Sequence, residues 1–503
     1  MVNASAPSGK IPLQSFYLNN NNSLTLQERL TSAIVELILN MRVPVGTRLP
    51  STRALARHLG ISRLTVSLVF TDLMARGYLD SRPRSGYVVA DTAPYRRLTL
   101  PRPEGGADHV NWQRYLAHDG LERRQIQKPQ NWRSYPYPFI YGQPDFQIFQ
   151  STIWRDCARR AMGARDYTIV ADDQLAQDDP MLIDYILRNT LIRRGIRARP
   201  EEVLLTIGAQ NALYITARML AGPGRLGVIE NPGYPDFAMA LQFAGLPYAL
   251  ARVDDKGLDP TNIPKGATLV AITPSHHIPT GATMPRQRRE ALLQQAARED
   301  FLIVEDDYET EMSVGTSPQP ALKALDEMGR VIYIGSFSKT LFPGLRIGFL
   351  VAPAPFIDQA RRVRAVMLRH PPGLLQRITA YFLALGHYDT YLRRLRHRMN
   401  ARRTELTAAL EKSPFQFAAE PRHGGSSLWM QTPDGTDSAL LAKTARERGV
   451  LIEPGKPFFE TAQDPCPFFR LGYSSLPRAS IQPGVDALSD AWRVGAGHDG
   501  PLG

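Results

Sequence analysis

The fold is decided by the stretch Gly335-Ser-Phe-Ser-Lys-Thr-Leu-Phe-Pro-Gly-Leu-Arg346, which follows the apolar run Val-Ile-Tyr-Ile. This pattern predicts a buried strand that ends beside an amine, the side chain of Lys339. Ser336, Ser338 and Arg346 can each donate hydrogen bonds to phosphate oxygens. Lys339 can form a Schiff base where burial or neighbouring cations lower its pKa. A pyridoxal phosphate (PLP) site needs these groups, although Ser-x-Ser-Lys alone is more common in surface turns.

The composition indicates a globular chain of more than one domain. It has 503 residues, of which 43% are hydrophobic and 21% are charged, and this length allows a large core. Cys157 and Cys466 are too few for a disulfide framework and lack metal-site spacing, so we expect no metal. Residues 1–10 lack the apolar segment of a signal peptide, and no apolar run is long enough to span a bilayer. We therefore expect a soluble, cytoplasmic protein.

Positive charge is concentrated at the start of the chain. Residues 1–90 hold ten Lys or Arg and four Asp or Glu, which gives +6 of the +12 net charge of the whole chain. A small basic region beside a nearly balanced remainder suggests a polyanionic partner for that region.

Residues 24–91 predict a winged helix-turn-helix domain, preceded by a polar leader over residues 1–23. Apolar spacing predicts a first helix over 25–41, Ser51 and Ser62 cap a second and a third helix, and two short extended pieces follow. In such a domain the third helix enters the major groove of DNA, and the basic turn between the extended pieces reaches phosphates or the minor groove. We therefore expect DNA contacts from Ser51, Arg53, Ser62, Arg63, Thr65, Ser67, Arg82 and Arg84.

One long stretch, GTRLPSTRALARHLGISRLTVSLVFTDLMARGYLDSRPRSGYVVA, resembles the DNA-binding domain of GntR-type bacterial regulators, and the resemblance covers about residues 24–90. It implies that double-stranded operator DNA is the partner of this domain. A three-helix scaffold without a DNA partner is the alternative, but the basic residues lie where groove contact would require them.

Residues 92–137 are rich in proline, glycine and charge, which is typical of a linker. Over residues 138–503 apolar runs alternate with helical patterns, which predicts an α/β domain with a mostly parallel sheet. Ligands of such domains bind at the carboxyl ends of the strands. The candidate strands are 203–207, 226–229, 269–273, 302–304, 331–334 and 347–352.

Polar motifs follow these runs where the strands should end. Gly208-Ala-Gln210 can begin a helix whose free N–H groups cradle a phosphate, and Tyr234 can lie over a pyridine ring. Asp306 can hold a ring nitrogen protonated, and Tyr308 can donate to a ring hydroxyl. With Lys339 and a Pro-Thr-Gly turn, these motifs form a set that accident would rarely produce, although each has a more ordinary structural interpretation alone.

The whole region resembles the fold-type I, class I aminotransferases, and joined to a GntR-like head it looks like the MocR/GabR-type regulators. The resemblance implies that Lys339 forms the Schiff base with PLP and that Arg470, in Phe468-Phe-Arg-Leu-Gly-Tyr473, binds a substrate or effector carboxylate. The cofactor-binding residues that it implies, besides Lys339, are Asp306, Tyr308, Tyr234, Gly208, Ala209, Gln210, Ser336, Ser338 and Arg346.

The sequence departs from the aminotransferase pattern at two places. Ile278 stands where those enzymes carry an Asn that bonds the phenolic oxygen of the cofactor, and His276 or His277 could take that role. The segment 173–180 lacks the usual glycine-containing turn, which puts ligand contacts there in question.

The resulting hypothesis is a PLP-dependent regulator that senses an amino compound, such as an amino acid, GABA or taurine, through an external aldimine. It would act as a homodimer, each head packed on the partner's body. Two alternatives remain: a true aminotransferase that carries a DNA-binding head, and a sensor whose ligand is PLP itself.

Overall fold

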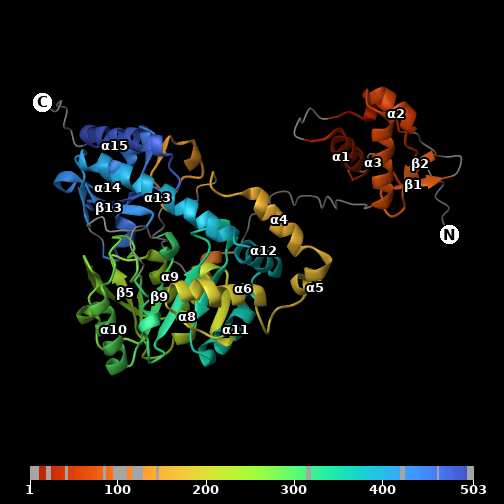
Figure 1. Ribbon diagram of the computed structural model, residues 1–503. Helices are drawn as coiled ribbons and strands as arrows, with labels where there is room; N and C mark the ends of the chain where they lie inside the picture. The colour runs from red at the N-terminus through yellow and green to blue at the C-terminus, as the bar shows by residue number, and fades with distance from the viewer. Residues whose placement is uncertain are drawn as a thin grey trace. The chain divides into compact units, whose positions relative to one another are not determined.

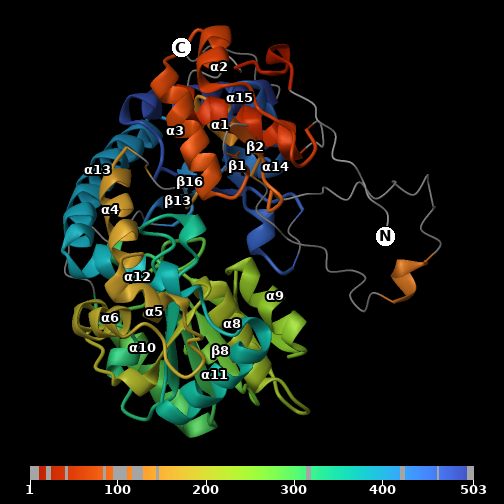
Figure 2. The same ribbon diagram turned by 90° about the vertical axis from the view of Figure 1, so that its right-hand side faces the viewer.

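The structure is a computed structural model, in which the chain divides into two compact units, Met1–Asp119 and Gly120–Gly503, each described by itself (Figures 1 and 2). We call them the head and the body. None of the described helices is long and apolar enough to cross a membrane. The described residues are 11–18, 24–39, 43–82, 86–93, 110–115, 128–142, 145, 147–312, 319–419, 425–461 and 464–495.

The head contains three helices followed by an antiparallel hairpin, as the sequence predicts. Ser51 and Ser62 cap α2 and α3, accepting hydrogen bonds from the N–H groups of Ala54 and Leu64 at 3.2 Å each. Gly60 ends α2 in the left-handed region, with φ 66°. The elements are α1 (Leu26–Leu39), α2 (Thr52–Leu59), α3 (Arg63–Ala75), β1 (Leu79–Arg82) and β2 (Gly86–Val89).

The head has its own hydrophobic core, because one face of each helix is apolar. Leu30 and Ile34 of α1, Leu55 of α2, and Val66 and Phe70 of α3 are almost completely buried together. This packing leaves the opposite face of α3 exposed to solvent.

The centre of the body is an eight-stranded sheet in the order β4-β11-β10-β9-β8-β5-β6-β7. Strands β10, β9, β8, β5 and β6 run parallel to one another, whereas β11 runs antiparallel to both β10 and β4, and β7 runs antiparallel to β6. The strands are β4 (Val203–Thr206), β5 (Gly227–Asn231), β6 (Tyr248–Asp254), β7 (Gly257–Leu258), β8 (Leu269–Ile272), β9 (Leu302–Asp306), β10 (Val331–Ser336) and β11 (Gly348–Val351).

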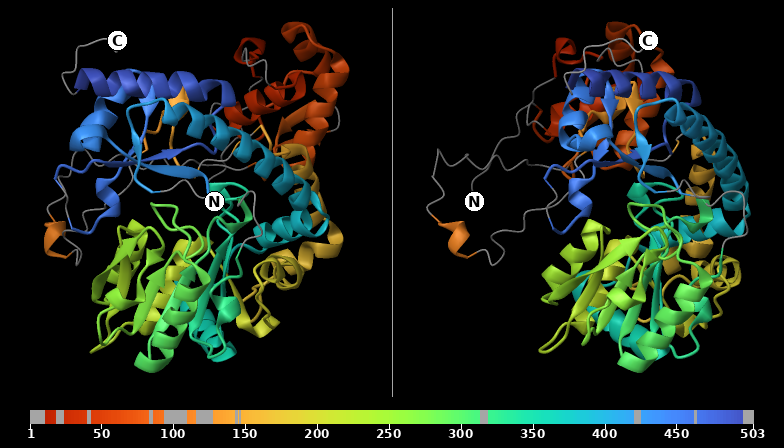
Figure 3. Two further views of the ribbon diagram at one scale, coloured as in Figure 1. Left: turned by 60° about the vertical axis from the view of Figure 1, so that its left-hand side comes forward. Right: turned by 90° about the vertical axis from the view of Figure 1, so that its left-hand side faces the viewer.

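Helices cover this sheet (Figures 1 and 3). Apolar side chains of the sheet, α8 and α9 form one core cluster, and a second cluster includes Leu292 of α10. The helices of this part are α4 (Ser151–Ala161), α5 (Ala164–Ala171), α6 (Pro180–Tyr185), α7 (Leu191–Arg193), α8 (Gly208–Leu220), α9 (Pro235–Ala244), α10 (Arg286–Glu299), α11 (Ala354–Leu368) and α12 (Gly373–Ala384). A π-helix over Ile186–Thr190 separates α6 from α7.

The C-terminal part forms a smaller layer, which includes the long helix α13 (Figure 3). Its antiparallel sheet has the order β12-β13-β16-β15, and a short parallel pair joins β14 to β3 near the start of the body. The elements are β3 (Tyr137–Pro138), α13 (His387–Glu411), β12 (Gln416–Phe417), β13 (Ser427–Gln431), α14 (Ser438–Glu447), β14 (Val450–Leu451), β15 (Glu453–Pro454), β16 (Phe468–Gly472) and α15 (Ile481–Gly495).

Candidate functional site

A cavity of about 740 Å³ lies in the body where the carboxyl ends of the parallel strands meet the smaller sheet. It brings together the predicted cofactor and effector residues except Gly208 and His276, which are not among the described lining residues. The lining consists of Lys128, Tyr141, Ala209, Gln210, Tyr234, Pro235, Asp236, Ile278, Asp306, Tyr308, Ser336, Ser338, Lys339, Arg346, Glu453 and Arg470.

Lys339 follows β10 and reaches into this cavity as a buried amine. Its Nζ lies 4.3 Å from the centroid of the Tyr141 ring. A Cβ atom on Gly142, whose φ is +72°, would lie 2.9 Å from the same Nζ. Burial lowers the pKa of Lys339, while the Glu309 carboxylate opposes that shift. The depressed pKa leaves more of the amine in the neutral, nucleophilic form.

The phosphate end of the cavity is formed by the start of α8 and by Arg346. Gly208 has φ +72°, and a Cβ atom there would lie 2.8 Å from Arg346 Nη2, so only glycine allows this approach. Arg346 Nη2 donates to the Ile207 carbonyl at 3.2 Å. The buried Ser338 hydroxyl has no hydrogen-bond partner among the described residues. Free N–H groups of a helix start, a guanidinium and an unsatisfied hydroxyl suit a phosphate group.

Asp306 is the last residue of β9 and lines the same cavity as Lys339. Burial, and then the neighbouring Asp307 carboxylate, raise the pKa of Asp306 to about 7. Its Oδ1 is buried and accepts no hydrogen bond from the part of the chain that the structure describes. A buried carboxyl oxygen without a donor fits a protonated ring nitrogen, because such a nitrogen would supply the missing donor and the opposing charge.

This environment predicts opposite effects of Asp306→Asn with and without cofactor. Asp306 has a folded-state pKa of about 7 against an ordinary value of 3.8. The ionised carboxylate therefore lowers the free energy of unfolding by its full amount above pH 7, and by less as the pH falls toward 4. In PLP-free protein the variant should be more stable at pH 8, by at most about 4 kcal/mol, and nearly equal to wild type at pH 4.

With PLP added, the variant should bind the cofactor more weakly, because a neutral amide does not stabilise a protonated ring nitrogen. Thermal unfolding at both pH values, with and without PLP, measures both effects. A variant less stable than wild type at pH 8 without PLP would contradict the account of Asp306.

Three other predicted residues, Tyr308, Tyr234 and His276, have partners within the protein. The Tyr308 hydroxyl donates to the His276 backbone carbonyl at 2.9 Å, and the Tyr234 hydroxyl donates to Asp236 at 2.7 Å. The His276 ring lies near Glu309, with 3.6 Å between Nε2 and Oε2, and is not among the described lining residues. Ile278, in contrast, lines the cavity with an apolar side chain.

Arg470 lies on β16 and already has a carboxylate partner. Its Nε donates to Glu453 Oε2 at 2.7 Å, and both side chains are almost fully buried. The guanidinium carbon lies 4.1 Å from the Tyr141 ring centroid and 4.7 Å from that of Phe458. Sequence reasoning identified Arg470 but missed Glu453 and Tyr141. The signal available for Tyr141 was its place directly after the apolar run 139–140 and directly before a glycine.

The buried pair predicts the effect of removing one partner. Arg470→Met should lower the free energy of unfolding by about 3–5 kcal/mol, because it leaves the Glu453 carboxylate buried without its counter-ion. Adding Glu453→Gln should restore most of the loss. Urea unfolding of the two variants and wild type measures this, and a double variant as unstable as the single one would show that lost packing, not charge, matters.

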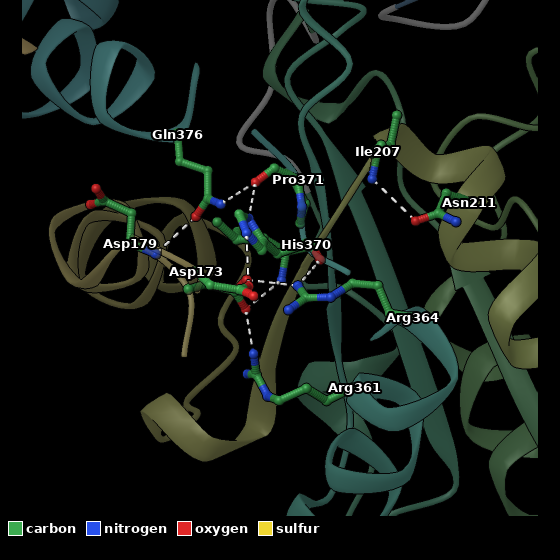
Figure 4. A network of polar contacts seen from close by, with 11 residues as sticks. Asp173, Asp179, Ile207, Asn211, Arg361, Arg364, His370, Pro371 and Gln376 are labelled. Carbon is green, nitrogen blue, oxygen red and sulfur yellow. Dashed lines mark hydrogen bonds and ion pairs between the residues drawn. The ribbon is translucent and has the colours of Figure 1, made fainter. Parts of the chain in front are cut away.

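The segment 173–180 has ion pairs in place of the expected glycine turn (Figure 4). Figure 4 shows Arg361 and Arg364 converging on one acidic group; Asp178 accepts from Arg364 Nη1 at 2.6 Å and from Arg361 Nη1 at 3.0 Å. The Gln376 amide oxygen accepts from the Asp179 N–H group at 2.8 Å. No residue of this segment is among the lining residues described for the cavity that contains Lys339, and its carboxylates connect the start of α6 to α11 and α12.

In the head, Ser51, Arg53, Ser62, Arg63 and Arg82 are exposed as predicted. Thr65 and Ser67 are only partly exposed, less than predicted, and their contact with DNA stays a prediction. The exposed side chains that flank them on α3 are Leu64 and Leu68, at 67% and 48% exposure, which sequence reasoning missed. Arg84 lies outside the described residues.

Comparisons with known proteins agree with both units. The model of "Bacterial regulatory proteins, gntR family" matches residues 26–89, and that of "Aminotransferase class I and II" matches residues 183–488. The HTH-type transcriptional regulator TauR of Rhodobacter capsulatus is 48% identical, covering 96% of this chain and 100% of TauR. The probable rhizopine catabolism regulatory protein MocR of Rhizobium meliloti is 32% identical, covering 94% of this chain and 95% of MocR.

Two solved structures resemble the body. One is LysN, an α-aminoadipate aminotransferase from Thermus thermophilus in complex with N-(5'-phosphopyridoxyl)-L-leucine. It is 25% identical with a TM-score of 0.69 and covers 77% of this chain and 100% of LysN. The other is Pyrococcus horikoshii kynurenine aminotransferase in complex with PMP. It is 25% identical with a TM-score of 0.67 and covers 76% of this chain and 98% of that enzyme.

Proposed function

The chain belongs to the MocR subfamily of GntR-type transcriptional regulators, and on this premise we propose that its body binds PLP and an amino compound, which changes how the head binds DNA. The observation that carries the proposal is one cavity that holds a buried lysine, a phosphate cradle and an orphaned carboxyl oxygen. These are Lys339, the Gly208–Arg346 contact and Asp306 Oδ1.

The residues present fit PLP in both shape and charge. When bound, PLP supplies an aldehyde that exchanges between a lysine and a free amine. Lys339 would hold the cofactor covalently, Arg346 and Ser338 would bind its phosphate, and Asp306 would hold the ring-nitrogen proton. Tyr234 lines the same cavity and would lie against the ring.

The effector would be an amine that carries an acidic group. Arg470 is the argument for the acid, because a planar guanidinium binds a carboxylate or sulfonate through two parallel hydrogen bonds. Its Nε is engaged by Glu453, so the terminal nitrogens of the guanidinium are the donors for an effector. Amino acids, GABA and taurine all carry the required pair of groups.

A homodimer of the chain completes the proposal. Among the described surface residues of the body, several large apolar side chains are exposed on α5, α7 and α11, including Tyr167 (62%), Ile192 (54%) and Val366 (90%). Exposed apolar side chains of this size favour a contact with another protein. We take a second copy of the chain as that partner, because most oligomers are symmetric assemblies of identical chains. Sedimentation of the full-length chain measures the state.

Two titrations on one preparation test the function. PLP-loaded protein is titrated with taurine, β-alanine, GABA and L-amino acids while its absorbance is followed. The same amines are then added to its complex with a fluorescent duplex, selected by the wild-type chain from random DNA. One amine should shift the absorbance and change DNA affinity at the same concentration. If an amine shifts the absorbance, leaves DNA affinity unchanged and is turned over steadily with a keto acid, the proposed function is wrong and the chain is an aminotransferase.

A further inference from the structure

We propose that Lys128 is an effector-binding residue: its ammonium, with Arg470, holds the acidic group of the effector and so joins the effector to the segment leading to the head. The inference rests on the proposed function and adds to it a second cation, together with a route from the ligand to the DNA-binding unit. Nothing in the sequence pattern of residues 92–137, which is typical of a linker, points to a ligand contact there.

Lys128 lies in the wall of the same cavity as Arg470. The residues that line this cavity include Lys128, Tyr141, Glu453 and Arg470. Partial burial lowers the pKa of Lys128, the Arg133 guanidinium adds to that shift, and the Glu453 carboxylate opposes it. Glu453, the partner of Arg470, therefore also favours the charged form of Lys128.

The segment that carries Lys128 is held against the cavity wall. Lys128 Nζ lies 5.3 Å from the centroid of the Trp132 ring. Trp132 is buried against Ile140 and Leu451. Strand β3 pairs in parallel with β14, which ends two residues before Glu453. Lys128 itself is exposed, and the segment that follows it packs through Trp132 and β3.

Tyr141, which follows this segment, contacts the Arg470–Glu453 pair directly. The Tyr141 N–H group donates to Glu453 Oε1 at 3.2 Å, and the Tyr141 ring lies under both Arg470 and Lys339. Tyr141 therefore contacts the amine that would hold the cofactor, the arginine that would hold the effector, and the carboxylate that pairs with that arginine.

Charge explains why a second cation matters. The Glu453 carboxylate largely offsets the charge of Arg470, so the pair alone attracts an anion weakly. Lys128 adds a second cation to the cavity wall that holds this pair. A second cation favours the binding of one carboxylate or sulfonate on an effector.

Lys128 is also close in sequence to the head. The head unit ends at Asp119, nine positions before Lys128. An effector that binds the Lys128 ammonium therefore restrains the residue from which the chain continues toward the head. By thermodynamic reciprocity, DNA binding by the head must then change effector affinity by the same factor.

The test uses full-length, PLP-loaded Lys128→Met, Lys128→Arg and, as a control, Lys265→Met at an exposed lysine of the body. Each protein is titrated with taurine, β-alanine and n-propylamine, which has no acidic group, and absorbance is recorded. Lys128→Met should bind taurine and β-alanine about tenfold more weakly and n-propylamine unchanged. Lys128→Arg should keep most of the affinity, and Lys265→Met should match wild type. The amine concentration that changes DNA affinity should move by the same factor.

The outcomes separate this inference from the proposed function. If wild-type absorbance responds to none of these amines, the proposed function fails and the role of Lys128 fails with it. If wild type responds, the inference alone is overturned by any of three results. These are equal constants for Lys128→Met and wild type, an equal loss for n-propylamine, and wild-type binding of acid-bearing amines no tighter than of n-propylamine.

Discussion

Lys339→Ala protein purified with PLP should lack the absorbance band expected of the wild-type chain, and its DNA affinity should not respond to amines. This is the largest effect we expect from a single substitution. Lys339 follows β10, and its buried amine lies 4.3 Å from the centroid of the Tyr141 ring, in the same cavity as Asp306. Alanine removes the nucleophile, and the other contacts of the cavity hold PLP only noncovalently.

The loss should be complete for covalent retention. Borohydride reduction followed by dialysis should leave PLP on wild type and on Lys265→Ala, an exposed control, and none on Lys339→Ala. The substitution also removes a positive charge that lowers the pKa of Asp306, so that carboxyl should stay protonated to higher pH. A reduced Lys339→Ala protein that still carries PLP in stoichiometric amount would show that another lysine holds the cofactor.

Arg63→Ala should abolish specific DNA binding while the head stays folded. Arg63 is the first residue of α3, directly after the Ser62 cap, and its side chain is exposed. The N-terminus of such a helix enters the major groove first, where an arginine can bind guanine through two hydrogen bonds. One such contact is worth about 1–3 kcal/mol, so the affinity for the selected duplex should fall by about 5- to 150-fold, toward that for a scrambled duplex.

Arg76→Ala is the matched control for charge. Arg76 ends the same helix, is exposed, and pairs with Asp72 at 3.0 Å, so its removal takes the same charge from the far end of α3. Anisotropy with the selected duplex and with a scrambled one separates specific from nonspecific affinity. Equal specific affinity for Arg63→Ala and wild type would show that α3 does not enter the groove by this end.

The sequence predicts much of the head and the sheet because both depend on local signals. Ser51 and Ser62 cap helices through bonds to residues two or three positions away, so the pattern alone locates α2 and α3. The buried strands are short apolar runs, and parallel strands end at one edge, which is why Asp306 and Lys339 lie in the same cavity.

The contacts that escaped prediction depend on register between distant segments. Glu453 faces Arg470 because β15 and β16 pair antiparallel with these two residues opposite each other, and no local pattern sets that register. Lys128 and Tyr141 reach the cavity because β3 pairs with β14, more than three hundred residues later. A segment that looks like a linker by composition therefore forms part of the site.

The exposure of Leu64 and Leu68 has a consequence for the DNA sequence that the head selects. They lie four positions apart on α3 and so share one face, within two turns of Arg63. The apolar group that the major groove offers is the C5-methyl of thymine. If α3 enters the groove as proposed, guanine opposite Arg63, followed by thymines along the path of these two leucines, is the base pattern that this helix surface would match, and methyl contacts would add to charge in operator choice.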